Sequence, residues 1–285
     1  MKGGPALAHD PSKTRPGGTA ARPFDARSYW EERLAKDFSL GGAGRLNWGI
    51  HYNRWQYRLI RQVFLRVVRE FSGDPGSMRV LDVGSGTGFY IDRWLEFGAG
   101  SITGLDITSV SVEKLREQYP KLTFHQLNVG GETATIPGGP YDMVSAMGVM
   151  FHIVDDKQYQ KALENMVAAL KPGGVLIFSE LFLHRPERRF SYIVHRPLSA
   201  IERMARKAGF EPVSRRPLFV LMNEPVDSGC PMLKLYWGIL QRIVNRVLWT
   251  GQLFGALLYP LDSLLVRIMK ESPATEIMVC RKPKR

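Results

Sequence analysis

Glycines at alternate positions follow a short apolar run in the first third of the chain, Val80-Leu-Asp-Val-Gly-Ser-Gly-Thr-Gly-Phe89. Glycine lets the backbone turn sharply and lets a ligand come close to the main chain. The free N–H groups at the start of a following helix favour a carboxylate or a phosphate. The spacing therefore predicts a strand, a turn and a helix that hold a small ligand. Such turns also occur in nicotinamide and flavin proteins, and in loops without a ligand.

Two carboxylates narrow this prediction. Asp82 lies two residues before the first glycine, and Asp106 ends the next predicted strand. At the tip of that strand a carboxylate can accept hydrogen bonds from both hydroxyls of a ribose. The alternative for Asp106 is a helix N-cap beside Thr108 and Ser109. Phe89 stands where a dinucleotide fingerprint would have its third glycine, so the pattern departs from that fingerprint.

These residues resemble the motifs of class I S-adenosylmethionine-dependent methyltransferases of the small-molecule type. Residues 81–88 resemble the first motif, Gly104-Leu-Asp-Ile107 the second, 141–153 the fourth, and 170–177 the segment that follows it. The motifs occur in the family's order across residues 78–220. The resemblance implies an enzyme that uses S-adenosylmethionine, releases S-adenosylhomocysteine and needs no metal.

The resemblance also implies which residues bind the cofactor. Asp82 would orient the glycine loop and the methionine amine, Asp106 would hold the ribose, and Ala146 would offer its carbonyl to the amine. Asn128 would face the adenine edge, where many relatives carry Asp. The implied cofactor contacts are Asp82, Gly84, Ser85, Gly86, Gly88, Phe89, Asp106, Ile107, Asn128, Val129, Ala146 and Met147.

Methyl transfer requires few catalytic side chains. Methyl transfer from a sulfonium is an in-line displacement, to which the protein contributes mainly proximity and orientation. A base is needed only when the acceptor must lose a proton. His152 follows the fourth predicted strand, and its imidazole could take that proton near neutral pH. The alternative is a histidine that packs or hydrogen-bonds near the start of a helix.

Other residues are candidates for the acceptor site. His184 follows the fifth predicted strand, and Arg196 could bind an anionic group, although a solvated arginine accounts for it as well. Aromatic residues gather before the first strand, where related enzymes have helices that cover the cofactor and line the acceptor pocket. Ordinary helix packing is the alternative for them. They are Tyr29, Trp30, Trp48, Tyr52 and Trp55, of which Tyr52 and Trp55 are the ones to test.

The elements that must position these residues alternate along the chain. Ser28 and Glu31 have the form of a capping box for a first helix, and Ser199 and Glu202 have that form for a later one. From residue 79 on, short apolar runs alternate with helical patterns, which predicts an α/β fold with helices on both faces of a parallel sheet. With the resemblance, this becomes a Rossmann-like, seven-stranded, mostly parallel sheet with an antiparallel last strand. An N-terminal helical cap and a helical insertion before the last strand complete the predicted fold.

The chain divides into five predicted parts. Glycine and proline mark a disordered arm, and apolar residues at helical spacing mark the insertion. The parts are the arm 1–22, the helical cap 23–76, the cofactor-binding core 77–226, the insertion 227–272, and the last strand with a basic tail 273–285.

The stretch 232–269 has three interpretations. Core packing or a lid over the substrate comes first, and a homodimer surface comes second. A helix that lies in a membrane interface comes third. The last is supported by Trp237, Trp249, Lys234, Arg242 and Arg246.

Composition limits the class of protein. No apolar run reaches the roughly 18 residues of a membrane-spanning helix. Two cysteines without metal-ligand spacing, and no secretory signal, predict a cytoplasmic protein. The acceptor is predicted to be an oxygen or nitrogen of a specialised metabolite, a sugar or a lipid-like molecule. The net charge of +12 favours a tRNA or rRNA methyltransferase as an alternative. The sequence lacks the Asn/Asp-Pro-Pro-Tyr/Phe motif and the Pro-Cys nucleophile of such enzymes, which counts against this alternative. A non-catalytic cofactor-binding partner subunit is the other alternative.

Overall fold

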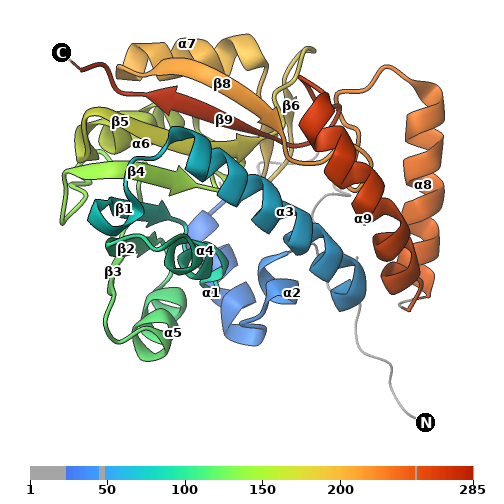
Figure 1. Ribbon diagram of the computed structural model, residues 1–285, viewed down its shortest axis with the longest axis horizontal. Coiled ribbons are helices and arrows are strands. Elements are labelled where there is room, and N and C mark those ends of the chain that lie inside the picture. The colour runs from blue at the N-terminus through green and yellow to red at the C-terminus, as the bar shows by residue number, and fades with distance from the viewer. Residues whose placement is uncertain (1–23, 45–48, 248, 285) are drawn as a thin grey trace.

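A seven-stranded sheet forms the centre of the computed structural model, which describes residues 24–44, 49–247 and 249–284 (Figure 1). The predicted arm 1–22 and Trp48 lie outside the described residues. The strand order is β3-β2-β1-β4-β5-β9-β8, and β9 runs antiparallel to both of its neighbours. The strands are β1 Arg79–Val83, β2 Ser101–Asp106, β3 Thr123–Gln126, β4 Tyr141–Ala146, β5 Leu170–Glu180, β8 Glu211–Pro217 and β9 Glu276–Arg281. The predicted fold is confirmed. Its division into five parts stays a prediction.

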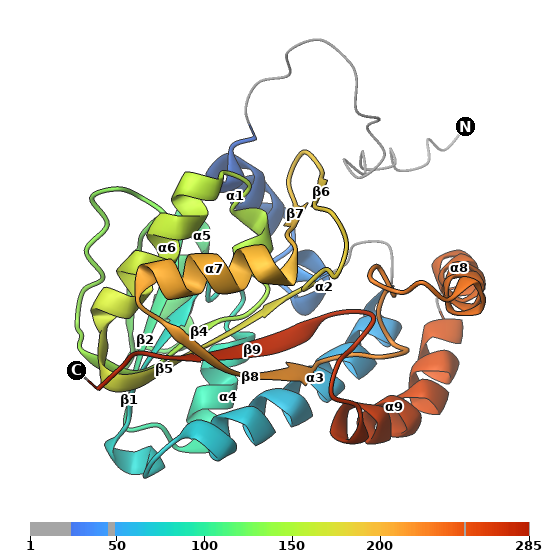
Figure 2. The same ribbon diagram turned by 90° about the horizontal axis from the view of Figure 1, so that it is seen from above.

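Helices cover both faces of this sheet (Figure 2). On one face α3, α4 and α5 share a buried cluster with α8 and α9, and on the other face α6 and α7 share a second cluster. The helices are α1 Ala26–Lys36, α2 Leu40–Ala43, α3 Gly49–Phe71, α4 Phe89–Phe97, α5 Ser109–Gln118, α6 Asp156–Ala169, α7 Leu198–Ala208, α8 Pro231–Arg246 and α9 Thr250–Ile268. Short 3₁₀ turns, η3 Pro75–Ser77 and η4 Met150–His152, and a hairpin of β6 Arg188–Arg189 and β7 Val194–His195 lie between them.

Side chains of the central strands point alternately into the two buried clusters on opposite faces of the sheet. In β1, Val80 belongs to the cluster under α3 and α4, whereas Leu81 and Val83 belong to the cluster under α6 and α7. Successive side chains of a strand point to opposite faces, so a strand covered on both faces is apolar throughout. Asp82 breaks that rule, because it is charged in type and almost fully buried.

Two of the predicted helix starts are wrong. The N-cap of α1 is Asp25, whose carboxylate accepts the N–H groups of Arg27 and Ser28, so Ser28 lies inside the helix. The helix α7 begins after Pro197, not at a capping box. In both places the N-cap is a residue upstream of the expected one, so the helix begins earlier than predicted.

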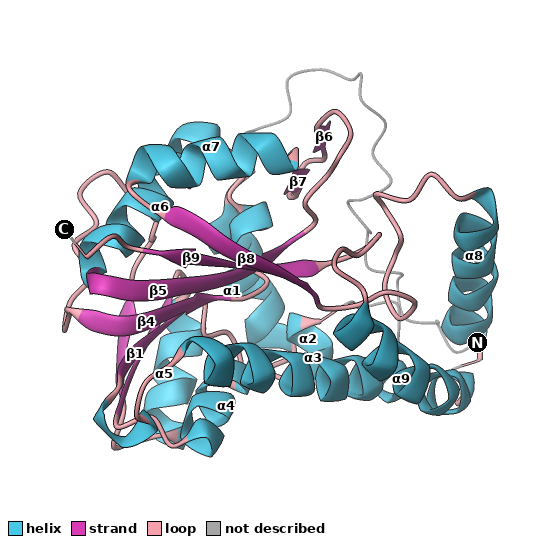
Figure 3. Cartoon of the chain, turned by 45° about the horizontal axis from the view of Figure 1, so that its top comes forward, coloured by secondary structure: helices cyan, strands magenta, loops and turns pink. Residues whose placement is uncertain are grey.

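The insertion forms two helices that project beyond the sheet, and α9 packs along α3 from Tyr52 to Arg66 (Figure 3). A side chain at Gly255 would overlap the Trp55 ring, and one at Gly251 would press on the Tyr52 backbone. These glycines therefore let α9 approach α3 closely. Among the described residues, none of the helices combines the length and the apolar character that a membrane span requires.

Candidate functional site

The glycine turn is held in shape by the neighbouring strand. Gly84, Gly86 and Gly88 have φ angles of 73°, 51° and 86°, a region that disfavours residues with a Cβ atom. The N–H groups of Gly84 and Ser85 both donate to the Leu105 carbonyl, at 2.7 and 2.9 Å. The turn after β1 is therefore fixed against the end of β2.

The three glycines have different surroundings. A Cβ atom on Gly84 would lie 2.3 Å from a Val149 methyl, and one on Gly88 would lie 2.9 Å from Leu115. A Cβ on Gly86 would meet nothing closer than 3.9 Å. Gly84 and Gly88 thus allow close packing within the protein, and the open side of Gly86 is the part of the turn that leaves room for a ligand.

Asp106 lies against this turn. Its Oδ2 accepts the Gly86 N–H at 2.8 Å, and its Oδ1 accepts the Thr108 N–H at 2.9 Å and the Thr108 hydroxyl at 2.7 Å. Burial raises the pKa of this carboxyl, although these hydrogen bonds oppose the shift. The N-cap of α5 is Thr108, which accepts the Ser111 N–H, so the alternative of Asp106 as N-cap is wrong.

Asp82 carries an oxygen that the described residues leave unsatisfied. Trp94 donates its indole N–H to the Ser145 hydroxyl at 3.0 Å, and Ser145 donates to Oδ1 of Asp82 at 2.6 Å. Oδ2 of Asp82 is buried and has no hydrogen-bond partner among the described residues. Burial, opposed by the hydrogen bond from Ser145, raises the pKa of Asp82 to about 7. A buried carboxylate oxygen without a partner suits a ligand that brings a positively charged donor.

The other predicted cofactor contacts are distributed along the same sheet edge. Ala146 and Met147 are buried at the end of β4, and Val129 is buried after β3. Ile107 is half-buried, and Asn128 is exposed with its side-chain oxygen accepting the Gly130 N–H. Phe89 packs between Tyr57 and Tyr90, with ring centroids 4.7 and 5.0 Å away, which places it in the contact between α3 and α4.

Helix α1 crosses this edge of the sheet. Glu31 accepts the N–H groups of Ser109 and Val110 at the start of α5, and the ring of its neighbour Trp30 lies 5.0 Å from that of His152, after β4. The strand order is β2-β1-β4, so α1 passes over the tip of β1, where the glycine turn lies. Glu31 therefore caps α5 and not its own helix, so the predicted capping box with Ser28 is wrong.

His152 lies within a cluster of rings. Its Nδ1 is 3.0 Å from the Tyr192 carbonyl, which can only accept, so Nδ1 carries the hydrogen and Nε2 keeps a lone pair. Burial, with a contribution from the Arg33 charge, lowers the pKa of His152 to about 4, so the ring is neutral near pH 7. The ring cluster comprises Phe24, Tyr29, Trp30, Phe151, His152 and Tyr192.

The predicted acceptor residues separate in space. Tyr29 belongs to the ring cluster, 5.7 Å from the Tyr192 ring centroid. Tyr52 is fully buried and donates its hydroxyl to the Met222 carbonyl. Trp55 packs on Tyr259 and donates to Gln252, both on α9. Tyr52 thus packs on the segment before the insertion and Trp55 packs on the insertion itself, and a role of either at the acceptor stays a prediction.

His184 and Arg196 are both tied to carboxylates. His184 Nδ1 lies 2.7 Å from an oxygen of Asp227. Arg196 is almost fully buried, so its interpretation as a solvated arginine is wrong; it pairs with Asp156 at 2.8 Å and lies over the Tyr159 ring.

Two features of this edge had no signal in the sequence. The Tyr192 backbone carbonyl is one, since any residue there would supply it. Buried Glu180 is the other; it accepts the Tyr159 hydroxyl at 2.9 Å, and burial raises its pKa to about 8 although Arg196 opposes the shift. Among the described residues, no three His, Cys, Asp or Glu side chains gather as a metal site would require.

Comparison with known proteins agrees with this geometry. A family profile described as a methyltransferase domain matches residues 80–174. The chain is 30% identical over 178 residues to the ubiquinone biosynthesis O-methyltransferase of Bordetella avium (strain 197N), which covers 55% of this chain and 72% of that protein. It is 30% identical over 154 residues to the tRNA U34 carboxymethyltransferase of Ectopseudomonas mendocina (strain ymp), covering 49% of this chain and 47% of that protein.

A solved structure shows the same fold. The 1,6-didemethyltoxoflavin-N1-methyltransferase of Burkholderia thailandensis, with bound 1,6-didemethyltoxoflavin and S-adenosylhomocysteine, superposes with a TM-score of 0.51. The superposition covers 93% of each chain at 16% identity.

Proposed function

This chain belongs to the class I S-adenosylmethionine-dependent methyltransferases, and we propose that it methylates an oxygen or nitrogen of a small molecule. The observation that carries the proposal is the ring cluster under α1, in which aromatic side chains surround one neutral imidazole. Aromatic rings with one polar group are typical of sites for small, largely apolar molecules. Specialised metabolites, sugars and lipid-like compounds remain the candidate acceptors.

The residues at the glycine turn fit the cofactor. The unpaired Oδ2 of Asp82 would accept from the methionine amine, and the open side of Gly86 would leave room for the methionine chain. Asp106 would hold the ribose if it exchanged part of its contact with Thr108 for the ribose hydroxyls. When bound, the cofactor supplies an electrophilic methyl group on a sulfonium.

His152 would act on the acceptor. Because Nδ1–H donates to the Tyr192 carbonyl, Nε2 is the only ring nitrogen whose lone pair can take a proton. A pKa of about 4 makes that atom a weak base, so its best role is to accept a hydrogen bond from an acceptor hydroxyl or amine and to take the proton as the methyl group is transferred. Trp30 and Glu31 would help α1 exclude water from this step.

Incubation of the protein with cell extract and deuteromethyl-labelled cofactor, followed by mass spectrometry, tests the proposal. We expect the label in a small molecule. A parallel sample of total tRNA and rRNA tests the alternative that the similarity to the carboxymethyltransferase raises, and label found only in RNA would replace our proposal. Cofactor binding measured by calorimetry without any labelled product would favour a non-catalytic partner subunit.

We infer the cellular compartment from the state of the two cysteines. Cys230 is exposed and Cys280 is buried, and both are free thiols. Exposed thiols persist in reducing compartments. We therefore keep the cytoplasm as the proposed location.

A further inference from the structure

The outward face of α9 is apolar along its length. Apolar residues follow one another at intervals of three and four, which places them on a single side of the helix. The exposed residues are Leu253, Ala256, Leu257, Pro260, Leu261, Leu264 and Ile268. Among them, Leu257 is 61% exposed and Leu264 is 55% exposed. A surface helix of a water-facing protein normally shows its polar side outward, so this arrangement calls for a partner.

The inward face of α9 is already occupied. Gly251 and Gly255 pack against α3, and Asp262 is fully buried, with its carboxylate accepting the backbone N–H groups of Val220, Leu221 and Met222. These contacts fix the rotation of α9 about its axis. The apolar stripe is therefore turned outward by packing on the other side of the helix.

Helix α8 adds a second apolar stripe with basic neighbours. Met232 is 79% exposed and Leu235 is 66% exposed, and Ile239 and Ile243 continue the same side. No acidic residue occurs between Asp227 and Asp262. The charged side chains of that stretch are Lys234, Arg242 and Arg246, and all three residues are exposed.

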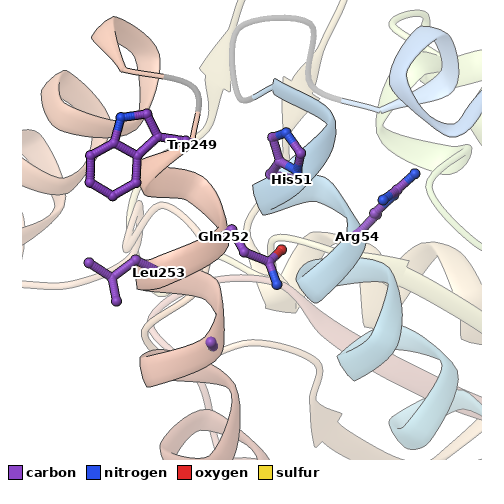
Figure 4. A pocket seen from close by; sticks show the side chains of 6 residues that line it. His51, Arg54, Trp249, Gln252 and Leu253 are labelled. Atoms are coloured by element: carbon purple, nitrogen blue, oxygen red, sulfur yellow. The ribbon is translucent and has the colours of Figure 1, made fainter.

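A hollow of about 680 Å³ lies where α3 and α9 begin (Figure 4). Its lining combines the cationic Arg54 and the imidazole of His51 with apolar Leu253 and Ala256 and the amide of Gln252. Trp249 borders it and is 66% exposed at the turn between α8 and α9. Indole rings favour the zone between lipid headgroups and acyl chains, where one end is wet and the other is apolar.

We propose that the α8–α9 face, made of the two exposed stripes, Trp249 and the flanking basic residues, docks on the surface of an anionic lipid bilayer. Apolar side chains would enter the interface while Lys234, Arg242 and Arg246 meet the negative headgroups. A second copy of this chain fits less well, because it would set these cations against the same cations. Docking on a bilayer does not depend on which acceptor is methylated, and it can be measured without methylation.

Vesicle flotation with the full chain tests the docking directly. We expect the protein to float with vesicles of equal parts phosphatidylcholine and phosphatidylglycerol, and to stay unbound with vesicles of phosphatidylcholine alone. Binding should weaken as salt rises, because the headgroup attraction is screened. Equal binding to both vesicle types, or none to either, overturns the proposal.

Surface variants locate the binding face. The double change Leu257→Glu with Leu264→Glu should abolish flotation, and Arg242→Gln with Arg246→Gln should lower the partition coefficient roughly tenfold or more, since each cation contributes near an anionic surface. Leu95→Glu is the matched control, because Leu95 is 45% exposed on α4, outside this face, and should leave binding unchanged. Cofactor affinity by calorimetry should be unchanged in all of these variants, which verifies their folding.

The homodimer interpretation is separated by light scattering. A monomer in solution that floats with anionic vesicles supports docking. A stable dimer that dissociates in the Leu257→Glu, Leu264→Glu variant and does not float would replace the bilayer with a second copy of this chain.

Discussion

The carboxylate of Glu31 caps the first turn of α5 by accepting the Ser109 N–H at 2.8 Å and the Ser109 hydroxyl at 2.7 Å. These residues are far apart in the sequence, and their contact fastens α1 across the tip of β1. Burial favours the protonated acid, but the hydrogen bonds from Ser109 and Val110 outweigh it and hold the pKa of Glu31 below its usual range. The helix that covers the glycine turn is thus tied down by an ionised carboxylate at a helix N-terminus, which the helix dipole also favours.

Glu31→Gln should loosen this cover. An amide would keep one acceptor but place a donor against the N–H groups of α5, so we expect weaker cofactor binding, by roughly 5–30-fold for the loss of about 1–2 kcal/mol. Calorimetry measures the affinity, and hydrogen exchange at Ser109 and Val110 should become faster. Glu32→Gln is the matched control, because Glu32 is exposed and pairs only with Lys36 among the described residues. If both variants bind the cofactor as the parent does, α1 is not a cover.

Asp82→Asn should cost most of the cofactor affinity, because the unpaired oxygen would no longer offer a charge to the methionine amine. The parent protein should also bind the cofactor more tightly as pH rises through about 7, since the raised pKa leaves Asp82 partly protonated below that pH. Calorimetry in buffers of different ionisation enthalpy should detect proton release on binding near pH 6.5. The asparagine variant should show no such release.

The raised pKa of Asp82 also makes folding depend on pH, with the opposite sign to cofactor binding. Because the folded chain holds a proton on Asp82 that the unfolded chain loses near its usual pKa, this group's contribution to stability is present at low pH and is lost as pH rises through about 7. In urea unfolding from pH 5 to 8 without cofactor, the free energy of unfolding of the parent relative to that of Asp82→Asn should therefore decrease as pH rises to about 7.

The sequence predicted what is encoded locally. The glycine turn, the two carboxylates and the alternation of strands and helices each depend on neighbours in the chain, and the fold they indicated is confirmed. The position of α1 over the glycine turn could not be predicted from the sequence, since the Glu31–Ser109 contact forms only after α1 has packed on the folded sheet. Tyr52 and Trp55 were expected at the acceptor because their residue types suit it. Both residues contact α9, a helix about 200 residues later whose packing no local pattern reveals.

His152→Asn separates a base from a packing residue. An asparagine amide can still donate to the Tyr192 carbonyl, as Nδ1–H does, but it has no atom in place of Nε2. If Nε2 takes the acceptor's proton, kcat should fall by roughly 10²–10⁴-fold with cofactor affinity unchanged. His125→Asn, on the edge strand β3, is the control. An asparagine variant with full kcat would leave His152 only its role in packing.

The low pKa of His152 gives a second, independent prediction. Between about pH 4 and its usual value near 6.5 the unfolded chain binds a proton here that the folded chain does not, so the contribution of His152 to stability should fall as pH drops below about 6.5. His152→Asn should lessen this fall in urea unfolding measured from pH 7 to 5. An unchanged slope in the variant would contradict the burial of the imidazole.

Tyr52→Phe should affect stability, whereas Trp30→Leu should affect binding of the acceptor. The Met222 carbonyl keeps a donor from Gln56 when the Tyr52 hydroxyl is removed, so Tyr52→Phe should cost about 0.5–1.5 kcal/mol of stability and leave KM for the acceptor unchanged. Trp30→Leu removes a ring from the cluster around His152 and should raise that KM. Initial-rate kinetics with the acceptor found by labelling would measure both. A raised KM in Tyr52→Phe would return Tyr52 to the acceptor site.

Asp262→Asn should destabilise the attachment of α9. The carboxylate accepts three backbone N–H groups, from Val220 and Leu221 at 2.9 Å and from Met222 at 3.0 Å, and an asparagine amide would turn a donor toward at least one of them. The site is fully buried, so water cannot replace the lost acceptor, and we expect a loss of about 2–4 kcal/mol. Thermal unfolding should shift down by roughly 5–10 °C. Asp74→Asn, at an exposed position, should shift it by less than a degree or two. Should the two variants unfold at the same temperature, the carboxylate would not be what holds α9 to residues 220–222.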